Sequence, residues 1–244
     1  MQRRAASAAL SRVPEARSGE TTKPGKRTRA NKYIGMRQAC NIMEAVAFAK
    51  FIGLPLVAHL TIHWSLTDVG DDPNGMLFAK VREGLDKWLE RRGIMFAGVW
   101  ARERQCRGQS DVEHCHLLFH LPVERRTGKK VAQVKDAILR LISLHGRGLT
   151  HDRVIDLTIW PDPDGKYLIK GGGSKVWKRF RLRKEHRRLQ GVIHGKRCGV
   201  TENIGAAARR RRKDQQCSGS PSSFLAGDTE MSSGDGRALH RQLS

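Results

Sequence analysis

Hydrophobic residues recur along the middle of the chain with the two periods that distinguish helices from strands. In three segments the apolar side chains return every three or four positions, so each segment is predicted to form a helix with one apolar face. These segments are residues 41–51, 77–92 and 130–144. A further helix or turn is expected to begin at Lys166, after a corner rich in proline and aspartate.

Four shorter segments have the patterning of strands. They are residues 56–66, 94–104, 112–121 and 154–160. The second and third are separated by a short polar loop and should pair as a hairpin. Several strands with a few interspersed helices predict an α+β fold, a two-layer sandwich whose central antiparallel sheet is covered by helices on one face.

The charge of the chain is strongly positive, with 46 Lys and Arg against 24 Asp and Glu and a formal net charge of +22. A surplus of this size indicates a polyanionic partner. The surplus is unevenly placed, because residues 41–164 carry 17 basic and 16 acidic residues, whereas residues 165–213 carry 17 basic and only 2 acidic ones.

The charge distribution divides the chain into four regions. We predict a basic disordered arm at 1–40, a folded unit at 41–175, a basic extension suited to a polyanionic partner at 176–213 and a disordered tail at 214–244. The five cysteines are scattered and odd in number, which favours neither a disulfide framework nor a zinc ribbon. The sequence contains no run of about 18 apolar residues, so no membrane span is predicted. A reducing cytoplasm is the expected location.

The residues best suited to metal chemistry lie in the strand predicted at 112–121. His114 and His116 are two positions apart, so they share one face of the strand while Cys115 points to the other. Neutral imidazole is a good ligand for Mn, Zn, Fe or Ni. The hairpin can bring Glu103 beside both histidines and complete a set of two imidazoles and one carboxylate. The structural alternatives are two surface histidines, and an ion pair of Glu103 with a neighbouring arginine.

A second group of residues is suited to covalent chemistry. Tyr167 is one of only two tyrosines in the chain, and in a helix it would share a face with Lys170, three positions later. A tyrosine acts as a nucleophile when a cation or a metal assists it, and Lys170 could supply that cation or hold a phosphate. The alternative is a tyrosine that only packs its ring beside a solvated lysine.

Basic and aromatic residues alternate after the tyrosine, and a run of arginines follows. Such side chains neutralise phosphates and stack on unpaired bases, so DNA binding is predicted for this region. The alternative is a packed helix with solvated charges. The candidate DNA-binding residues are Lys175, Trp177, Lys178, Arg179, Arg181, Arg183, Arg209, Arg210, Arg211 and Arg212.

The order and spacing of three motifs resemble those of the HUH endonucleases, the superfamily of rolling-circle replication initiators and relaxases. The motifs are a strand at 59–64, the histidine pair at 114–116, and a Tyr-x-x-Lys about 50 residues later. The stretch 100–122 is similar to small replication initiators encoded by bacterial plasmids and integrated phages. The resemblance covers roughly residues 50–175, and Gly171 in place of a second tyrosine indicates a single-tyrosine type.

The resemblance implies a DNA-nicking enzyme with an HUH or RRM-like, ferredoxin-like sheet. His114 and His116, with Glu103, would bind Mg²⁺ or Mn²⁺ that polarises a phosphate of single-stranded DNA. Tyr167 would attack this phosphate, leaving a 5′-phosphotyrosine and a free 3′-hydroxyl, while Lys170 would orient it. The implied partner is single-stranded or hairpin DNA at a replication origin in a bacterial cytoplasm.

Further expectations concern partners and rival functions. The sequence has no phosphate-binding loop motif, so a host helicase is expected to unwind the nicked duplex, and a homodimer is one route to strand closure. A transposase or a conjugative relaxase would use the same chemistry. A non-catalytic nucleic-acid-binding protein, or a zinc site that joins Cys106 to the two histidines, is the alternative of a different class.

Overall fold

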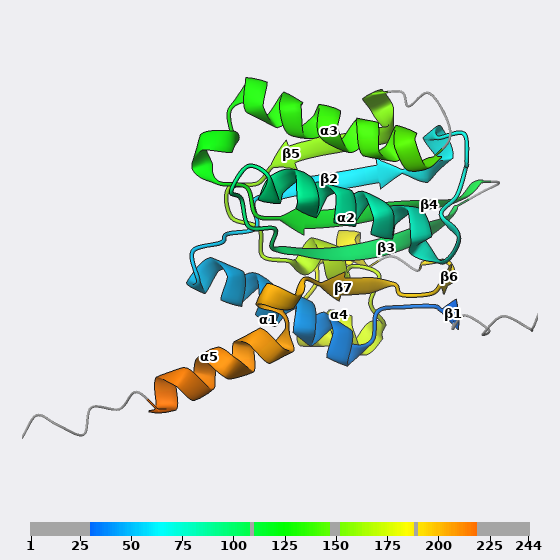
Figure 1. Cartoon of the computed structure of the whole chain (residues 1–244). Coiled ribbons are helices and arrows are strands. Elements are labelled where there is room, and N and C mark those ends of the chain that lie inside the picture. Colours follow the sequence, from blue (N-terminus) through cyan, green and yellow to red (C-terminus); the bar gives the residue numbers. More distant parts are fainter. Residues whose placement is uncertain (1–29, 108–109, 147–151, 188–189, 219–244) are drawn as a thin grey trace, which may run out of the picture.

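The central element of the structure, a computed structural model, is an antiparallel sheet of five strands in the order β5-β2-β4-β3-β7 (Figure 1). The structure describes residues 30–107, 110–146, 152–187 and 190–218. The strands of the sheet are β2 Ala58–His63, β3 Gly98–Arg107, β4 Ser110–Phe119, β5 Ile155–Ile159 and β7 Cys198–Val200. A separate two-stranded ribbon pairs β1 Ala30–Asn31 with β6 Ile193–His194.

The long hairpin of β3 and β4 provides the centre of the sheet. Its pairing continues out to Arg107 and Ser110, so most of the polar segment predicted as a loop at 105–110 is strand. Cross-strand hydrogen bonds extend the ladder through polar residues, which a hydrophobicity pattern does not reveal. The strands at 56–66, 94–104, 112–121 and 154–160 are otherwise found close to their predicted positions.

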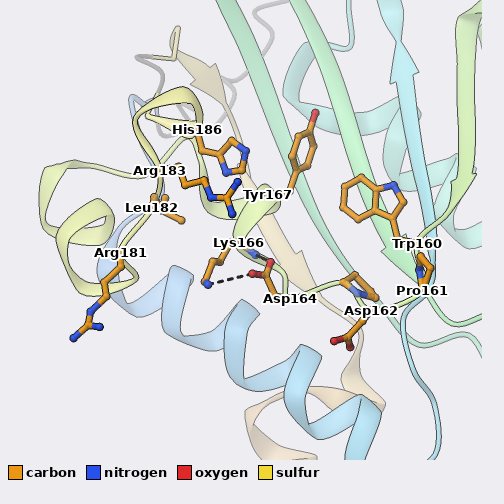
Figure 2. A pocket seen from close by; sticks show the side chains of 11 residues that line it. Trp160, Pro161, Asp162, Asp164, Lys166, Tyr167, Arg181, Leu182, Arg183 and His186 are labelled. Carbon is orange, nitrogen blue, oxygen red and sulfur yellow. Dashed lines mark hydrogen bonds and ion pairs between the residues drawn. The ribbon is translucent and has the colours of Figure 1, made fainter.

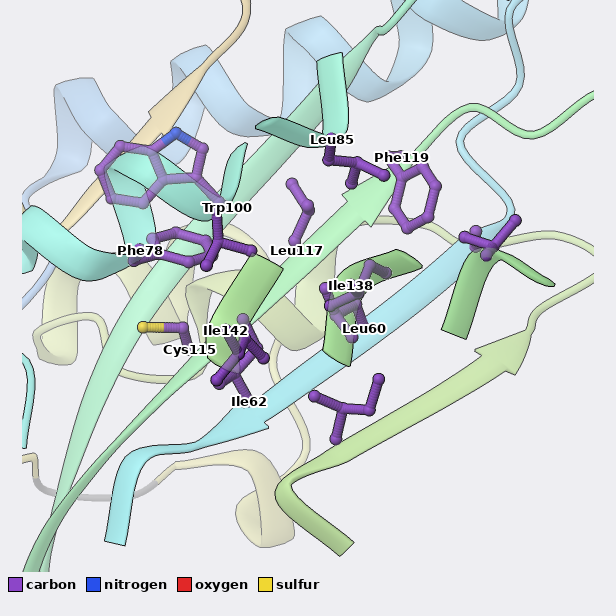
Figure 3. Packing of buried hydrophobic residues seen from close by; sticks show 14 of the residues in the cluster. Leu60, Ile62, Phe78, Leu85, Trp100, Cys115, Leu117, Phe119, Ile138 and Ile142 are labelled. Atoms are coloured by element: carbon purple, nitrogen blue, oxygen red, sulfur yellow. The ribbon is translucent and has the colours of Figure 1, made fainter. Parts of the chain in front are cut away.

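Two helices, α2 Met76–Glu90 and α3 Gly128–Gly146, cover one face of the sheet (Figure 1). Their apolar sides pack on alternate residues of the strands, and the resulting core is buried (Figure 3). It includes Leu60, Ile62, Phe78, Leu85, Trp100, Cys115, Leu117, Phe119, Ile138 and Ile142. Because side chains of a strand alternate between faces, the strand residues between those of this core point to the opposite face of the sheet.

The opposite face also carries a helix, so the prediction that helices cover one face only is wrong. Helix α1 Met36–Phe51 packs there in a second core, against residues of β3 and β4 that include Val99, Ala101 and Leu118. These residues alternate with the first core, so the centre of the sheet is apolar on both sides. The folded part also begins before the predicted boundary at residue 40, because Ile34 is buried and α1 starts at Met36.

The region predicted as a DNA-binding extension at 176–213 belongs to the fold. Val176, Leu182 and Ile204 are buried in the second core, and β7 extends the sheet beside β3. Its helices are α4 Ser174–Arg179 and α5 Ala206–Ser218, and α5 projects away from the sheet (Figure 1). The short 3₁₀ turns are η1 Trp64–Leu66, η2 Pro73–Gly75, η3 Val123–Arg125, η4 Asp152–Val154, η5 Lys166–Ile169, η6 Lys184–His186 and η7 Glu202–Ile204.

Two predicted regions reach beyond the described part of the chain. Most of the arm at 1–40 and of the tail at 214–244 lies outside the described residues, although α5 continues to Ser218. Among the helices described, none combines the length and the apolar character needed to cross a membrane.

Candidate metal centre

The structure brings the three candidate ligands together on the α1 side of the sheet. Glu103 on β3 lies directly opposite His114 on β4, and His116 follows two positions later on the same face. The Glu103 Oε2 atom is 3.3 Å from His114 Nε2 and 3.5 Å from His116 Nε2. All three side chains are buried, and one possible ligand atom from each lies within 4.8 Å of the others.

The neighbouring arginines do not pair with Glu103, although the sequence offers that alternative. Strand alternation turns Arg102 to the opposite face, where its Nε donates to Glu113 Oε1 at 2.6 Å. Arg104 pairs with Asp71 at 2.5 Å. The basic partner of Glu103 comes instead from a distant segment.

That partner is Lys170, which the sequence places next to the tyrosine rather than next to the carboxylate. Its Nζ lies 3.1 Å from Glu103 Oε2 and 3.3 Å from His116 Nε2, and the residue is only 7% exposed. The ammonium group therefore contacts the same two atoms that a metal ion would use as ligands.

Electrostatics favour the protonation states that metal ligands need. Burial alone would raise the pKa of Glu103, but hydrogen bonds from His114 and His116 and the charge of Lys170 together hold it below its usual value. Burial lowers the pKa of His116 to about 4, even though Glu103 acts in the opposite direction. At neutral pH the site thus offers an ionised carboxylate and a neutral imidazole.

Strand β2 orients one of the histidines. Thr61 lies opposite His116 in the register, and its Oγ1 is 3.0 Å from His116 Nδ1. Without a metal, His116 Nε2–H donates to Glu103 and Nδ1 accepts from the Thr61 hydroxyl. In the other tautomer Nδ1–H donates to the hydroxyl oxygen, and Nε2 then carries no proton and is available to a cation. Thr61 therefore acts on the geometry of the candidate ligand without being one itself.

A further histidine of β2, His59, lies between His116 and Trp160. The His59 ring stacks on Trp160, with ring centroids 4.0 Å apart, and lies 5.3 Å from His116. Burial lowers its pKa to about 3, and the nearby His116 and Lys170 act in the same direction. His59 is therefore neutral and forms an aromatic support for the cluster.

Tyr167 joins this aromatic group from η5. Its ring meets His59, His116 and Trp160 edge-on, with centroid distances of 5.2, 4.9 and 5.4 Å. In a 3₁₀ turn, residues three apart are eclipsed, which places the Lys170 ammonium 3.7 Å from the centre of the Tyr167 ring. The predicted pairing of Tyr167 with Lys170 on one face is therefore present, in a 3₁₀ turn rather than an α-helix.

The donor set fits a divalent cation. Two imidazoles and a carboxylate on neighbouring strands are a combination that binds Mn²⁺, Fe²⁺ or Zn²⁺, and Mg²⁺ where oxygen ligands from substrate and water complete the shell. Glu103 Oε1 is buried and has no hydrogen-bond partner among the described residues. An orphaned carboxylate oxygen beside two imidazoles is the feature that a bound cation would satisfy.

The candidate DNA-binding residues divide into exposed and anchored groups. Two of them have internal partners: Trp177 donates its indole N–H to the Lys170 carbonyl at 3.1 Å, and Arg209 contacts Asn41 at 2.8 Å and Glu44 at 3.0 Å. The first bond fastens α4 to η5 and the second fastens α5 to α1. The exposed ones are Lys175, Lys178, Arg179, Arg181, Arg183, Arg210, Arg211 and Arg212.

The sequence reasoning missed Thr61, the packing of His59 and the position of Trp160. A signal existed for the first two, because His59 and Thr61 alternate with the apolar Leu60 and Ile62 in a strand. The side chain of Cys106, which a zinc site would need, lies outside the described ones.

Comparisons with known proteins add no family assignment. A scan against protein-family models finds no match, and a search of curated proteins finds none either.

Proposed function

We propose that the chain is a metal-dependent endonuclease that nicks single-stranded DNA and transfers the strand through Tyr167, initiating rolling-circle replication of a plasmid or phage. The observation that carries the proposal is the packing of the Tyr167 ring against His116, with centroids 4.9 Å apart, at the edge of the Glu103, His114 and His116 cluster. Motif order and the α+β sheet support membership of the HUH superfamily with a single tyrosine.

Each residue has a distinct task in this proposal. Glu103, His114 and His116 hold Mg²⁺ or Mn²⁺, which supplies Lewis-acid polarisation of a phosphate oxygen when it is bound. The Tyr167 oxygen forms a bond to phosphorus while the bond from phosphorus to the 3′ oxygen breaks. The phenol gives up its proton and the released 3′ oxygen takes one up, so the products are a 5′-phosphotyrosine and a 3′-hydroxyl.

Lys170 contributes positive charge beside the nucleophile. Its ammonium lies 3.7 Å from the centre of the Tyr167 ring, which suits it to hold the phosphate that Tyr167 attacks. No second tyrosine follows on this turn, since Gly171 occupies the position four residues later. Strand closure then requires attack by a 3′-hydroxyl or a second copy of the protein.

In this proposal the exposed basic side chains of α4 and α5 bind the phosphates of the DNA. The basic residues of α4 follow directly after η5, and Arg210, Arg211 and Arg212 line the projecting helix α5. We propose single-stranded or hairpin origin DNA as the substrate, a host helicase as the partner and a bacterial cytoplasm as the location. A transposase or relaxase would use the same centre on other DNA ends.

The test is a covalent-adduct assay. A labelled single-stranded hairpin oligonucleotide is incubated with protein and Mn²⁺, and the products are separated on a denaturing gel. Wild-type protein should form an adduct that EDTA prevents, and Tyr167→Phe should form none while still binding the DNA.

The chain offers a matched control, because its other tyrosine, Tyr33, is 60% exposed and lines a different pocket, together with Gly35, Gly173 and Val176. Tyr33→Phe should form the adduct at the wild-type rate. Adduct formation by Tyr167→Phe, or a wild-type protein that never forms one on any hairpin or single strand tested, contradicts the proposed chemistry.

A further inference from the structure

A pocket of about 410 Å³ opens beside the Tyr167 ring (Figure 2). Its walls are the corner at 160–164 after β5, the turn η5, and residues 181–186 after α4. The volume falls within the range of about 300–1,000 Å³ that is typical of small-ligand sites. Figure 2 shows the Tyr167 hydroxyl pointing away from Asp164 and Lys166, so a ligand in the pocket would lie next to the nucleophile without covering its oxygen.

The two carboxylates of this pocket are already neutralised by lysines. Asp162 accepts from Lys50 at 2.9 Å, and Asp164 pairs with Lys166 at 3.2 Å. The remaining charged groups in its walls are therefore decisive for the kind of ligand that the pocket attracts.

These groups are two arginines. Arg181 and Arg183 are exposed, and neither forms an ion pair with any residue that the structure describes. In Figure 2, Arg183 extends toward Tyr167, whereas Arg181 lies at the outer rim of the pocket and its guanidinium points away from the other residues that line it. The pocket thus carries unmatched positive charge, which suits a phosphate.

Arg181 has a backbone conformation that favours glycine. Its φ of 50° lies in the left-handed region. It follows the C-cap of α4, where the amides of Arg181 and Leu182 bond to the carbonyls of Lys178 and Trp177 at 3.3 and 3.0 Å. Glycine is the usual residue at this point of such a motif. The chain therefore keeps a strained arginine at the mouth of the pocket, and residues of this kind cluster at binding sites.

Rings and prolines form the other part of the walls. Trp160 rests on His59 with an angle of 23° between the ring planes, and it lines the pocket together with Pro161, Pro163 and His186. A rigid tryptophan backed by another ring is suited to stacking on an unpaired base.

We propose that this pocket binds one unpaired nucleotide of single-stranded DNA, with its base against Trp160 and its phosphate at Arg183, while Arg181 contacts the strand where it leaves the pocket. The inference rests on the proposed function for its substrate, and it identifies where the strand is held beside Tyr167. Duplex DNA does not fit this arrangement, because its bases are stacked on one another and their faces are not available.

The first experiment measures binding alone. Fluorescence anisotropy of a labelled single-stranded oligonucleotide is followed in EDTA over a series of salt concentrations. Arg183→Ala should weaken binding roughly fivefold and reduce the slope of log K against log salt by about 0.7, the value for one lost phosphate contact on a single strand. Arg181→Gly should also weaken binding, and it should fold at least as stably as the wild type because glycine relieves the strained backbone.

The matched control is Arg140→Ala. Arg140 lines a groove between α2 and α3, on the opposite side of the sheet, and it is exposed like the pocket arginines. This variant loses the same charge and should retain wild-type affinity and salt slope. If Arg183→Ala and Arg181→Gly bind as Arg140→Ala does, the pocket does not hold the strand and the inference is overturned.

A photocrosslinking experiment locates the base. An oligonucleotide that carries 5-iododeoxyuridine should crosslink to Trp160 or His186 on irradiation, as read by mass spectrometry of the digested protein. Crosslinks confined to α5 would contradict the inference. Free deoxynucleoside monophosphate should compete only weakly, and a mononucleotide that binds as tightly as the oligonucleotide would instead assign the pocket to a free nucleotide.

The two proposals fail separately. Pocket variants that bind like the control, in a protein that still forms the Tyr167 adduct, would reject the pocket and leave the nickase standing. Pocket variants that lose binding, in a protein that never forms an adduct, would support the strand-binding pocket and reject the nickase.

Discussion

Lys170 is predicted to compete with the metal ion, because its ammonium group contacts the two atoms that a metal would use. The Lys170 Nζ to Glu103 Oε2 distance of 3.1 Å corresponds to about 5 kcal/mol of Coulomb attraction at an effective dielectric constant near 20. A divalent ion about 4 Å from a stationary ammonium would be repelled by about 8 kcal/mol on the same scale. The lysine must therefore withdraw when a metal binds, and its lost attraction opposes binding.

The perturbation is Lys170→Met, which keeps an unbranched chain of similar length and removes the charge. If only a quarter of the attraction survives the cost of desolvation, the variant gains about 1.4 kcal/mol, which is tenfold in affinity. We therefore expect Mn²⁺ to bind at least tenfold more tightly to Lys170→Met than to the wild type. Isothermal titration calorimetry without DNA measures this affinity directly, and the electron paramagnetic resonance signal of free Mn²⁺ provides an independent count.

The control is Lys166→Met on the same turn, where the lysine is more exposed and pairs with Asp164. This variant should bind Mn²⁺ like the wild type. A Lys170→Met protein with a native circular dichroism spectrum and unchanged or weaker Mn²⁺ affinity would refute the reasoning.

Three more predictions follow from the same contacts. Thr61→Val should weaken Mn²⁺ binding about 10- to 100-fold in calorimetry, because the His116 ring loses its orienting partner, whereas Thr61→Ser should retain most of the affinity. Arg102→Met should lower the free energy of unfolding by about 3–5 kcal/mol in urea titrations, because Glu113 stays buried without its partner, and Arg102→Met/Glu113→Leu should recover most of this loss. In EDTA, the free energy of unfolding should fall by about 2 kcal/mol between pH 6.5 and pH 5.

The sign of the pH effect follows from three buried groups. His59 and His116 have folded-state pKa values of about 3 and about 4, below the ordinary 6.5. The unfolded chain therefore takes up protons first as the pH falls, and each histidine lowers the free energy of unfolding by about 2 kcal/mol by pH 5. Burial raises the pKa of Glu113 to about 7 despite Arg102, so at this group the folded state takes up the proton first. Glu113 therefore raises the free energy of unfolding by about 2 kcal/mol over the same interval. A free energy of unfolding that is constant or rises on acidification would contradict this balance. Equal Mn²⁺ affinities for the two Thr61 variants would contradict the orienting role of Thr61. An undiminished stability of Arg102→Met would contradict the proposed cost of leaving Glu113 without its partner.

Local patterns predicted much of the candidate centre. Strand alternation places His114 and His116 on one face and Cys115 on the other, and a hairpin suffices to set Glu103 opposite them. These inferences need only the period of a strand and one short connection. They hold because both features are determined by residues close together in the sequence.

Contacts between distant segments were beyond the same reasoning. Thr61 reaches the cluster only because β2 pairs with β4, 55 residues from the histidine that it contacts. Charge patterns also do not distinguish a free cation from an anchored one, so the sequence groups Arg209 with the exposed arginines of α5, although its side chain contacts Asn41 and Glu44 of α1. The second helix layer was missed for a related reason, since small apolar residues such as Ala97 and Ala101 accept a helix without a strong hydrophobic signal.

The buried pair of Arg102 and Glu113 has a consequence for the specificity of folding. A slip of one residue between β3 and β4 would turn every side chain of the moved strand to the other face. Glu103 would then enter the apolar layer under α2 and α3, and Arg102 would take its place beside the histidines. Arg102 opposes this, because besides Glu113 it binds the carbonyls of Asp72 and His194, which only the native alignment brings within reach. The ion pair thus fixes the register of β3 against β4, and it does so on the face of the sheet opposite the candidate metal ligands.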